Sequence, residues 1–212
     1  MNPLYYLAIP IILGMISVFF LYGMGNDEGS LFSKKNLMEN GSPVLGDPSA
    51  PITILEWGDY QCTFCYRFHQ SSLNIILAEY VDSGKINLVF KDFPLNGPDS
   101  ILGAEATYCA GDQGKYWAFH NELYSNWAGE KTGWINHDSL NQFAKSVNLE
   151  LVEFTACLDE HKYKQKVLEL EKFGKEIGID ATPSFLIFND KKIIKIRGNQ
   201  PIDAFRQAID DL

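Results

Sequence analysis

Two cysteines separated by two residues, Cys62 and Cys65, have the type and spacing needed for thiol–disulfide exchange. The residues before them, 52–57, are apolar and rich in β-branched side chains, which predicts a buried strand. The residues after them carry apolar side chains at helical spacing up to residue 80, which predicts a helix. A CxxC pair that opens a helix directly after a strand is typical of a redox motif.

The position of the pair at the start of a helix predicts different roles for the two cysteines. Free backbone N–H groups and the positive end of the helix dipole stabilise a thiolate at this place. Cys65 lies on the apolar stripe of the helix, whereas Cys62 lies at its mouth. We therefore expect Cys62 to be the attacking thiol, with a pKa below that of free cysteine, and Cys65 to be the buried resolving thiol.

A CxxC pair also occurs in zinc and haem sites. A structural zinc site needs four ligands, and the sequence near the pair offers only His69, with no second CxxC and no HxxxH pair elsewhere. Covalent haem attachment needs a histidine directly after the second cysteine, where this chain has Tyr66. We therefore expect no metal and no other cofactor.

Length and charge limit the function further. A chain of 212 residues with 46% hydrophobic content suits one domain plus appendages. The net charge of −9 argues against a nucleic-acid partner, which needs a clustered basic surface.

The N-terminus predicts a membrane anchor over residues 1–25. Leu4–Tyr22 contains no charged residue and, as a helix, would be about 28 Å long, close to the apolar thickness of a bilayer. A cleavable signal peptide has a basic first segment, whereas no Lys or Arg precedes Lys34 here. An uncleaved anchor is therefore the favoured interpretation, and a cleaved signal is the alternative.

Two features of the sequence give opposite predictions for the side of the membrane on which the domain lies. Lys34 and Lys35 come after the apolar stretch, and the positive-inside rule would keep the main domain in the cytoplasm. Disulfide chemistry belongs to oxidising compartments. We give this second argument more weight and predict a catalytic domain outside the cytoplasm.

The order of the elements predicts an α/β fold with an interruption. Residues 26–49 are rich in Gly, Ser, Asn, Asp and Pro and suggest a linker, followed by a domain over 50–212. That domain contains a β-α-β half, a helical insertion at about 98–180 and a β-β-α half, the order of a thioredoxin fold with a helical insertion. The expected elements are a strand at 52–57, a helix at 62–81, a strand at 86–93, a helix capped by Asn136 or Asp138, a helix at 158–177, strands at 184–188 and 193–196, and a last helix from Pro201.

The sequence resembles the DsbA family of thiol–disulfide oxidoreductases, in particular its membrane-anchored members, over residues 44–212. The resemblance rests on short motifs in a fixed order, namely LEWGDYQCTFC at 55–65, AEA at 104–106 with GKYW at 114–117, and TPSF at 182–185. One departure is Thr63-Phe64 between the cysteines, where the best-studied members have Pro-His. Their strongly oxidising character therefore does not transfer directly.

The resemblance implies a cis peptide bond before Pro183, in a loop that faces the cysteine pair. A proline at the start of a strand is more often trans, so the sequence alone does not predict this. In the family's geometry the backbone of Thr182 can pair with an extended substrate segment and hold its cysteine near Cys62.

Glu56 is a carboxylate inside an apolar strand. Burial there would raise its pKa and let it exchange a proton with Cys65 through a water. The alternative is a carboxylate at a strand end that reaches solvent. Family members carry an acidic residue at this place, which favours the proton-relay role. Asp59, in contrast, lies in the predicted turn and is expected to be solvated. His69 is expected to be a surface or partly packed histidine.

Several aromatic side chains crowd the motif and allow two interpretations. They form either part of the core or an apolar landing surface for unfolded chains. These residues are Trp57, Tyr60, Phe64 and Tyr66.

Cys109 and Cys157 both fall in the helical insertion. Buried cysteines can act simply as small apolar side chains. In an oxidising compartment, a pair within one small subdomain favours a structural disulfide.

These features together predict a membrane-anchored thiol–disulfide oxidoreductase that acts through Cys62 and Cys65. We expect an oxidase that introduces disulfides into reduced or unfolded exported proteins and is reoxidised by a quinone-linked membrane protein. A reductase or isomerase of the same fold is one alternative. A redox-inert binding module tethered to the bilayer is another.

Overall fold

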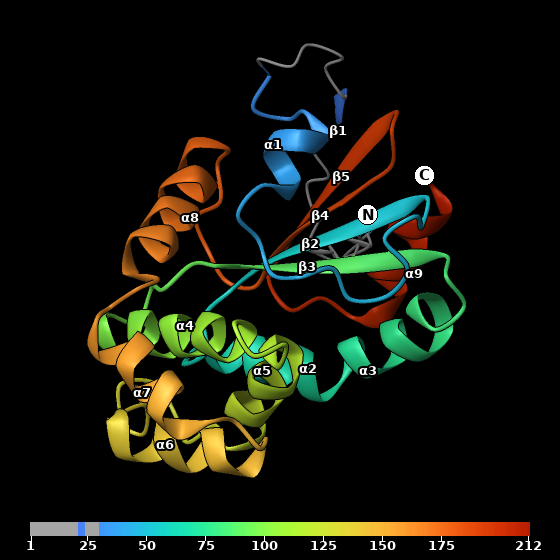
Figure 1. The fold of residues 1–212 in the computed structure, drawn as a ribbon. Helices are drawn as coiled ribbons and strands as arrows, with labels where there is room; N and C mark the ends of the chain where they lie inside the picture. Colours follow the sequence, from blue (N-terminus) through green and yellow to red (C-terminus); the bar gives the residue numbers. More distant parts are fainter. Residues whose placement is uncertain (1–20, 24–29) are drawn as a thin grey trace, which may run out of the picture.

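The computed structural model describes residues 21–23 and 30–212, which form a five-stranded sheet with helices on both faces (Figure 1). The strand order is β1-β5-β4-β2-β3; β2 and β3 run parallel, and the other neighbours run antiparallel. The strands are β1 Leu21–Gly23, β2 Ile52–Gly58, β3 Ile86–Asp92, β4 Ser184–Phe188 and β5 Lys192–Arg197.

The central strands are buried on both faces, as their near-continuous apolar sequence predicts. Every residue of β2 and β3 is buried. Because side chains alternate along a strand, Ile54 packs with the cluster that contains Phe68 and Phe205. Leu55 and Trp57 belong to a different cluster on the opposite face.

The helix predicted at 62–81 is divided in the structure. It consists of α2 Thr63–Gln70, α3 Ser72–Ile76 and the π-helical turn η1 Leu77–Val81. The break lies at Ser71, which has φ −125° and ψ −86°. Its hydroxyl donates to the Arg67 carbonyl over 2.7 Å, and a serine that bonds back to the preceding turn competes with the regular helical ladder.

The helical insertion lies between β3 and β4 (Figure 1). Asn136 caps α6 with its side chain, as one of the two predicted caps. The single helix predicted at 158–177 is wrong, because His161 adopts φ 51° and ends the preceding helix. The helices are α4 Pro98–Gly111, α5 Tyr116–Ser125, α6 His137–Ser146, α7 Leu151–Asp159, α8 Lys164–Glu176 and, after β5, α9 Ile202–Asp210.

The segment before the first central strand packs against the domain from residue 30 onward. Lys34–Met38 form helix α1, and Leu37 on it is completely buried. Leu45 pairs with Leu88 of β3 in an isolated bridge. The segment expected as a linker, 26–49, is therefore in large part packed against the sheet.

The predicted membrane-spanning stretch, Leu4–Tyr22, lies outside the described residues except for its end. Leu21 and Tyr22 belong to strand β1 and not to a helix, because the open edge of β5 supplies backbone partners for them. Within 21–23 and 30–212, no helix has the length and apolar character required to cross a bilayer.

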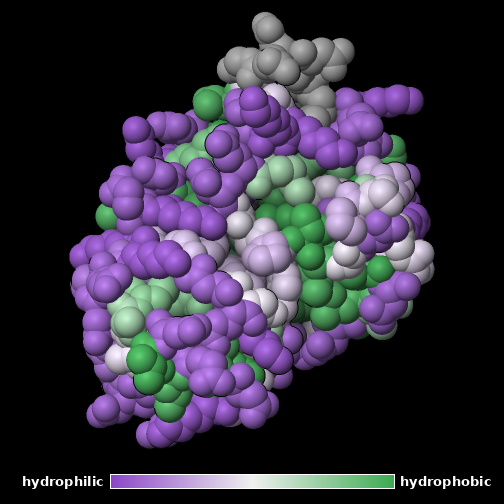
Figure 2. Space-filling model, viewed as in Figure 1, coloured by the Kyte–Doolittle hydropathy of each residue, from purple (hydrophilic) through white to green (hydrophobic). Residues whose placement is uncertain are grey.

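The predicted architecture, a β-α-β half and a β-β-α half separated by helices, is confirmed. The surface of the protein is mainly hydrophilic on the face seen in Figure 2, with hydrophobic areas near the middle and at the lower left. Near β3, a groove of about 400 Å³ has a partly apolar lining that includes Leu45, Leu73, Leu77 and Trp117.

Candidate active site

The two cysteines lie where β2 passes into α2. Cys62 is the N-cap residue of α2, and Cys65 lies in its first turn. Both are free thiols and both are buried, Cys65 completely. The helix is preceded by a turn in which the Cys62 N–H donates to the Asp59 carbonyl over 3.0 Å. The chain thus places a cysteine where the N-terminal amides of a helix converge.

The loop before β4 faces this pair. The Thr182–Pro183 peptide bond is cis, as the family resemblance implies. The Cys62 Sγ–H donates to the Thr182 carbonyl oxygen over 3.4 Å, although 120 residues separate them in the sequence. The pair and the proline loop therefore form one site.

The surroundings shift the pKa values of the two thiols in opposite directions. Hydrogen bonding from the Cys65 thiol, helped by Thr182 and the amides of Cys65 and Phe64, lowers the pKa of Cys62 to about 6 against the opposing effect of burial. Burial raises the pKa of Cys65 well above its ordinary value, and the hydrogen bond to Cys62 adds to this. At neutral pH the site therefore holds a thiolate at Cys62 and a neutral thiol at Cys65.

Glu56 lies beneath the pair and is only 3% exposed, so the solvent-reaching interpretation is wrong. Burial raises its pKa to about 8, and repulsion by the Cys62 thiolate adds to the effect. Space beside it is tight, because a Cβ at Gly58 would lie 3.4 Å from Glu56 Oε1 and collide with the Phe90 ring. Only glycine fits there without displacing the ring or the carboxyl group.

The prediction that Asp59 is a solvated turn residue is wrong, since it is 2% exposed. Its Oδ1 accepts from the Gln61 N–H over 2.8 Å and from the Ser100 hydroxyl over 2.7 Å. Its Oδ2 accepts from the Asn96 N–H over 2.8 Å. Burial raises its pKa, and these hydrogen bonds counteract the effect. Asp59 thus ties the turn before Cys62 to the start of the insertion.

Residues of the insertion also reach the motif, which sequence reasoning missed. The Glu130 carboxylate accepts from the Thr63 N–H over 2.8 Å. The Trp127 indole donates to the Gln61 carbonyl over 2.9 Å, and the Lys131 N–H donates to the Gln61 side chain over 2.8 Å. These contacts span 66 to 70 residues, so no local pattern in the sequence indicates them.

Some of the aromatic side chains around the motif belong to the core, and one is exposed as a landing surface would require. Trp57 and Tyr60 are buried and belong to the core. Tyr66 is half-buried and stacks on Trp127 with ring centroids 4.6 Å apart. Phe64 is 53% exposed and is therefore the one member of this set open to a partner. His69 is half-buried, as expected, and stacks on Tyr124.

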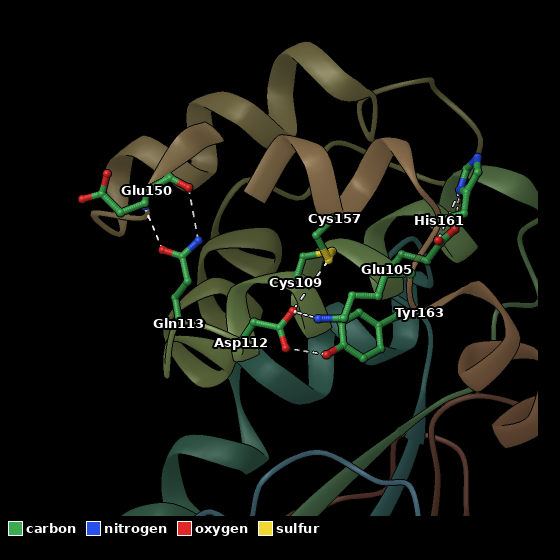
Figure 3. Close-up of a disulfide and its surroundings, with 9 residues drawn as sticks. Glu105, Cys109, Asp112, Gln113, Glu150, Cys157, His161 and Tyr163 are labelled. Atoms are coloured by element: carbon green, nitrogen blue, oxygen red, sulfur yellow. Dashed lines mark hydrogen bonds and ion pairs between the residues drawn. A yellow bond between two sulfur atoms is a disulfide. The ribbon is translucent and has the colours of Figure 1, made fainter. Parts of the chain in front are cut away.

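The other two cysteines form a disulfide between α4 and α7 (Figure 3). The S–S distance between Cys109 and Cys157 is 2.01 Å, and both residues are buried. Beside it, Gln113 exchanges two hydrogen bonds with the backbone of Glu150. Within the described part of the chain, no group of three or more His, Cys, Asp or Glu residues is arranged to hold a metal ion.

Asp92, at the end of β3, is a further buried carboxyl group on this side of the sheet. Neither of its oxygens makes a hydrogen bond within the described residues. Burial raises its pKa to about 7, while the charge of Lys166 acts in the opposite direction. Folding therefore favours the protonated form of Asp92.

We expect Asp92→Asn to make the stability of the protein less dependent on pH. The folded pKa lies above the unfolded one, so the stabilisation from Asp92 is complete below about pH 4 and is lost as pH rises through about 7. Asparagine removes this loss. The free energy of unfolding of the variant, relative to that of the wild type, should therefore rise by roughly 2–4 kcal/mol between about pH 4 and pH 8. Urea unfolding at several pH values measures the difference. A difference that stays constant with pH contradicts a buried, protonated Asp92.

Comparison with known proteins places this geometry in context. Residues 38–211 match the family model described as Thioredoxin. The chain is 30% identical over 171 residues to a probable disulfide bond formation protein D of Bacillus cereus, covering 78% of this chain and 76% of the relative.

Two solved structures have the same fold. BdbD of Bacillus subtilis, in its oxidised form, superposes with a TM-score of 0.72 at 25% identity, covering 80% of this chain and 91% of that one. The α-DsbA1 protein of Wolbachia pipientis gives a TM-score of 0.72 at 27% identity, covering 82% and 91%.

Proposed function

Since the chain belongs to the thioredoxin family, with relatives named disulfide bond formation protein D, we propose that it introduces disulfide bonds into other proteins through Cys62 and Cys65. It is a thiol–disulfide oxidoreductase of the DsbA type. The proposed direction of the reaction rests on the difference in acidity between the two cysteines. Cys62, at the mouth of the helix, is a thiolate, whereas Cys65 is a neutral and fully buried thiol.

The exchange proceeds in two steps. A substrate thiolate attacks Cys62 Sγ of the oxidised pair, which forms a mixed disulfide and releases Cys65 as a thiolate that takes up a proton. A second substrate thiolate then attacks the substrate sulfur, closes the substrate disulfide and releases the Cys62 thiolate. The substrate loses two electrons and two protons, and the pair gains the electrons.

The acidity of Cys62 favours this direction. A thiol of low pKa is a good leaving group, and its thiolate stabilises the reduced form of the enzyme. The site supplies this stabilisation from Cys65, from Thr182 and from the helix N-terminus. Phe64 offers no further hydrogen-bond donor from its side chain, so we expect a pair less oxidising than the Pro-His members of the family.

The proline loop supports a role in holding the substrate. The carbonyl of Thr182 lies within reach of Cys62 Sγ and precedes a strand, so its backbone can pair with an extended segment. Phe64, exposed between the two cysteines, offers an apolar contact to the same unfolded chain.

Glu56 is proposed to carry the proton of Cys65. Cys65 leaves as a thiolate in a buried position and must be protonated, and Glu56 is a buried carboxyl group whose pKa of about 8 keeps it mostly protonated at neutral pH. A buried acid of this pKa can donate a proton to Cys65 through a water in one half-reaction and accept it back in the next.

Glu56→Gln should therefore slow turnover by about 10- to 100-fold at neutral pH, because an unprotonated Cys65 thiolate attacks the mixed disulfide and returns the pair to its oxidised form. The pH profile should also lose the inflection near pH 8 that the carboxyl group contributes. Stopped-flow mixing with a reduced dithiol peptide measures both. An unchanged rate and pH profile in a folded Glu56→Gln variant would rule out the relay.

We also propose that the domain works outside the cytoplasm, held at the membrane by the N-terminal stretch, and that a quinone-linked membrane protein reoxidises it. The chemistry of the pair supports this, since disulfides persist in oxidising compartments. An impermeant thiol reagent, applied to intact cells after mild reduction, should label Cys62. Protection until the cells are lysed would place the domain in the cytoplasm.

The reduction potential of the pair tests the oxidase assignment. Equilibration with glutathione buffers should give a value well above the roughly −270 mV typical of thioredoxin. A potential near about −270 mV would make the protein a reductase. The other alternative, a redox-inert binding module, predicts no oxidation of a dithiol substrate at all.

A further inference from the structure

A loop of the helical insertion is fastened to the start of the redox helix. The loop, residues 127–131, comes after α5 and bonds to Gln61 and Thr63, on either side of Cys62. The stacking of Tyr66 on Trp127, at an interplanar angle of 10°, fixes the loop against α2. The side chain of Gln61 is itself anchored, because it donates to the Ser100 hydroxyl over 2.8 Å.

One contact of this loop brings a negative charge to the reactive cysteine. Thr63 is the first residue of α2 and directly follows Cys62. Its N–H is one of the amides at the helix N-terminus that have no partner within the helix, and it donates to Glu130 Oε1 over 2.8 Å. Glu130 thus caps the helix from outside, 67 residues away in the sequence.

This cap acts against the Cys62 thiolate. The partial positive charge at a helix N-terminus favours any anion, and Glu130 and the thiolate of Cys62 share it. The Thr63 N–H is occupied by Glu130, whereas the groups that lower the pKa of Cys62 are Cys65, Thr182 and the amide of Phe64. The effect of Glu130 on the thiolate is therefore repulsion between two like charges, and that repulsion penalises the reduced form of the pair.

We propose that Glu130 is a positioning residue that sets the redox poise of the site, its carboxylate making the Cys62–Cys65 pair less oxidising than the helix alone would make it. The inference rests on the redox role proposed for the pair and deepens it. Glu130 lies on the surface of the insertion, and the capping bond holds its charge in place. The insertion thereby contributes to the chemistry as well as covering the sheet.

Glu130→Gln is the direct test, because glutamine keeps an acceptor for the Thr63 N–H and removes only the charge. We expect the pKa of Cys62 to fall by about half a unit, the effect of one exposed charge at short range in water. At pH 7 this stabilises the reduced form about threefold relative to the wild type, which corresponds to a potential about 14 mV higher. Thiolate absorbance during a pH titration and equilibration with glutathione measure the two quantities.

A matched control separates this from a general change of charge. Glu153→Gln removes an equal charge from α7, beside the Cys109–Cys157 disulfide, and should leave both quantities unchanged. A second variant, Thr63→Pro, removes the N–H that Glu130 binds, at the first helical position, where proline is tolerated. In that background Glu130→Gln should have a smaller effect, because the cap no longer fixes the charge.

The outcomes distinguish this inference from the function it rests on. The pKa of Cys62 is measured without any substrate, so it reports on Glu130 even if the protein proves to be a reductase. An unchanged or raised pKa in Glu130→Gln, in a protein with wild-type thermal stability, overturns the inference and leaves the oxidase proposal intact. An equal effect of Glu153→Gln would also overturn it.

Discussion

Cys62→Ser is expected to abolish dithiol oxidation, lowering the rate by roughly three orders of magnitude or more, because it removes the sulfur that forms the mixed disulfide. Cys65→Ser is expected to lose turnover as well but to trap substrates. With no resolving thiol, the mixed disulfide between Cys62 and the substrate persists. In that variant the Cys62 thiolate attacks one sulfur of a substrate disulfide and the other sulfur leaves as a thiolate. Non-reducing electrophoresis after mixing each variant with an unfolded protein that carries a disulfide shows the difference.

The geometry explains why the two variants differ. Cys62 caps the helix and has a pKa of about 6, whereas Cys65 is completely buried and its pKa is raised. A substrate sulfur can therefore remain bonded to Cys62, while Cys65 is shielded. Adducts that form through Cys65 in the Cys62→Ser variant would contradict this assignment.

A comparison of two replacements at Cys65 refines the test. The hydrogen bond from Cys65 is the largest effect that lowers the pKa of Cys62. Serine can still donate a hydrogen bond and alanine cannot, so Cys65→Ala should give a higher Cys62 pKa than Cys65→Ser. The rate of alkylation by iodoacetamide as a function of pH measures this difference.

The elements that carry the chemistry are closely predicted by local patterns. The alternation and apolar content of 52–57 and 86–93 predict two buried strands, and the helical stripe after Cys62 predicts the redox helix. The burial of Glu56 results from its place within such a strand. The cis bond before Pro183 required the family resemblance, because local sequence does not distinguish it from an ordinary trans proline.

The parts that sequence reasoning missed depend on contacts between distant segments. Glu130 reaches Thr63 across 67 residues, and nothing in the loop sequence distinguishes it from a solvated acid. Asp59 is buried because Ser100 and Asn96 close over it from the insertion. One local signal was present, since an aspartate two residues before a bonded N–H, here that of Gln61, is typical of an Asx-turn.

Helix ends were misplaced where single residues leave the helical conformation. The break at Ser71 comes from a side chain that bonds the preceding turn, and the break at His161 comes from a left-handed backbone. The apolar period of the flanking residues continues across both breaks, so periodicity alone joins the helices on either side of them.

Replacing both Cys109 and Cys157 with alanine should lower the free energy of unfolding by about 4 kcal/mol and leave catalysis nearly unchanged. The disulfide closes a loop between residues 48 apart, and removing it releases that constraint from the unfolded chain. For a domain of this size the loss corresponds to a fall of about 8–16 °C in Tm. Calorimetry and a dithiol oxidation assay, run on the same preparation, measure the two effects.

The surrounding contacts explain why the fold should survive that loss. Asp112, next to the disulfide on the same side of α4, accepts from Lys162 over 2.7 Å and from Tyr163 over 2.5 Å, and Gln113 bonds the backbone of Glu150 (Figure 3). These bonds join α4 to the segments on either side of α7 without the sulfur bridge. Loss of oxidation activity in a variant that keeps its fold would show that the disulfide takes part in electron transfer, and the structural role would then be wrong.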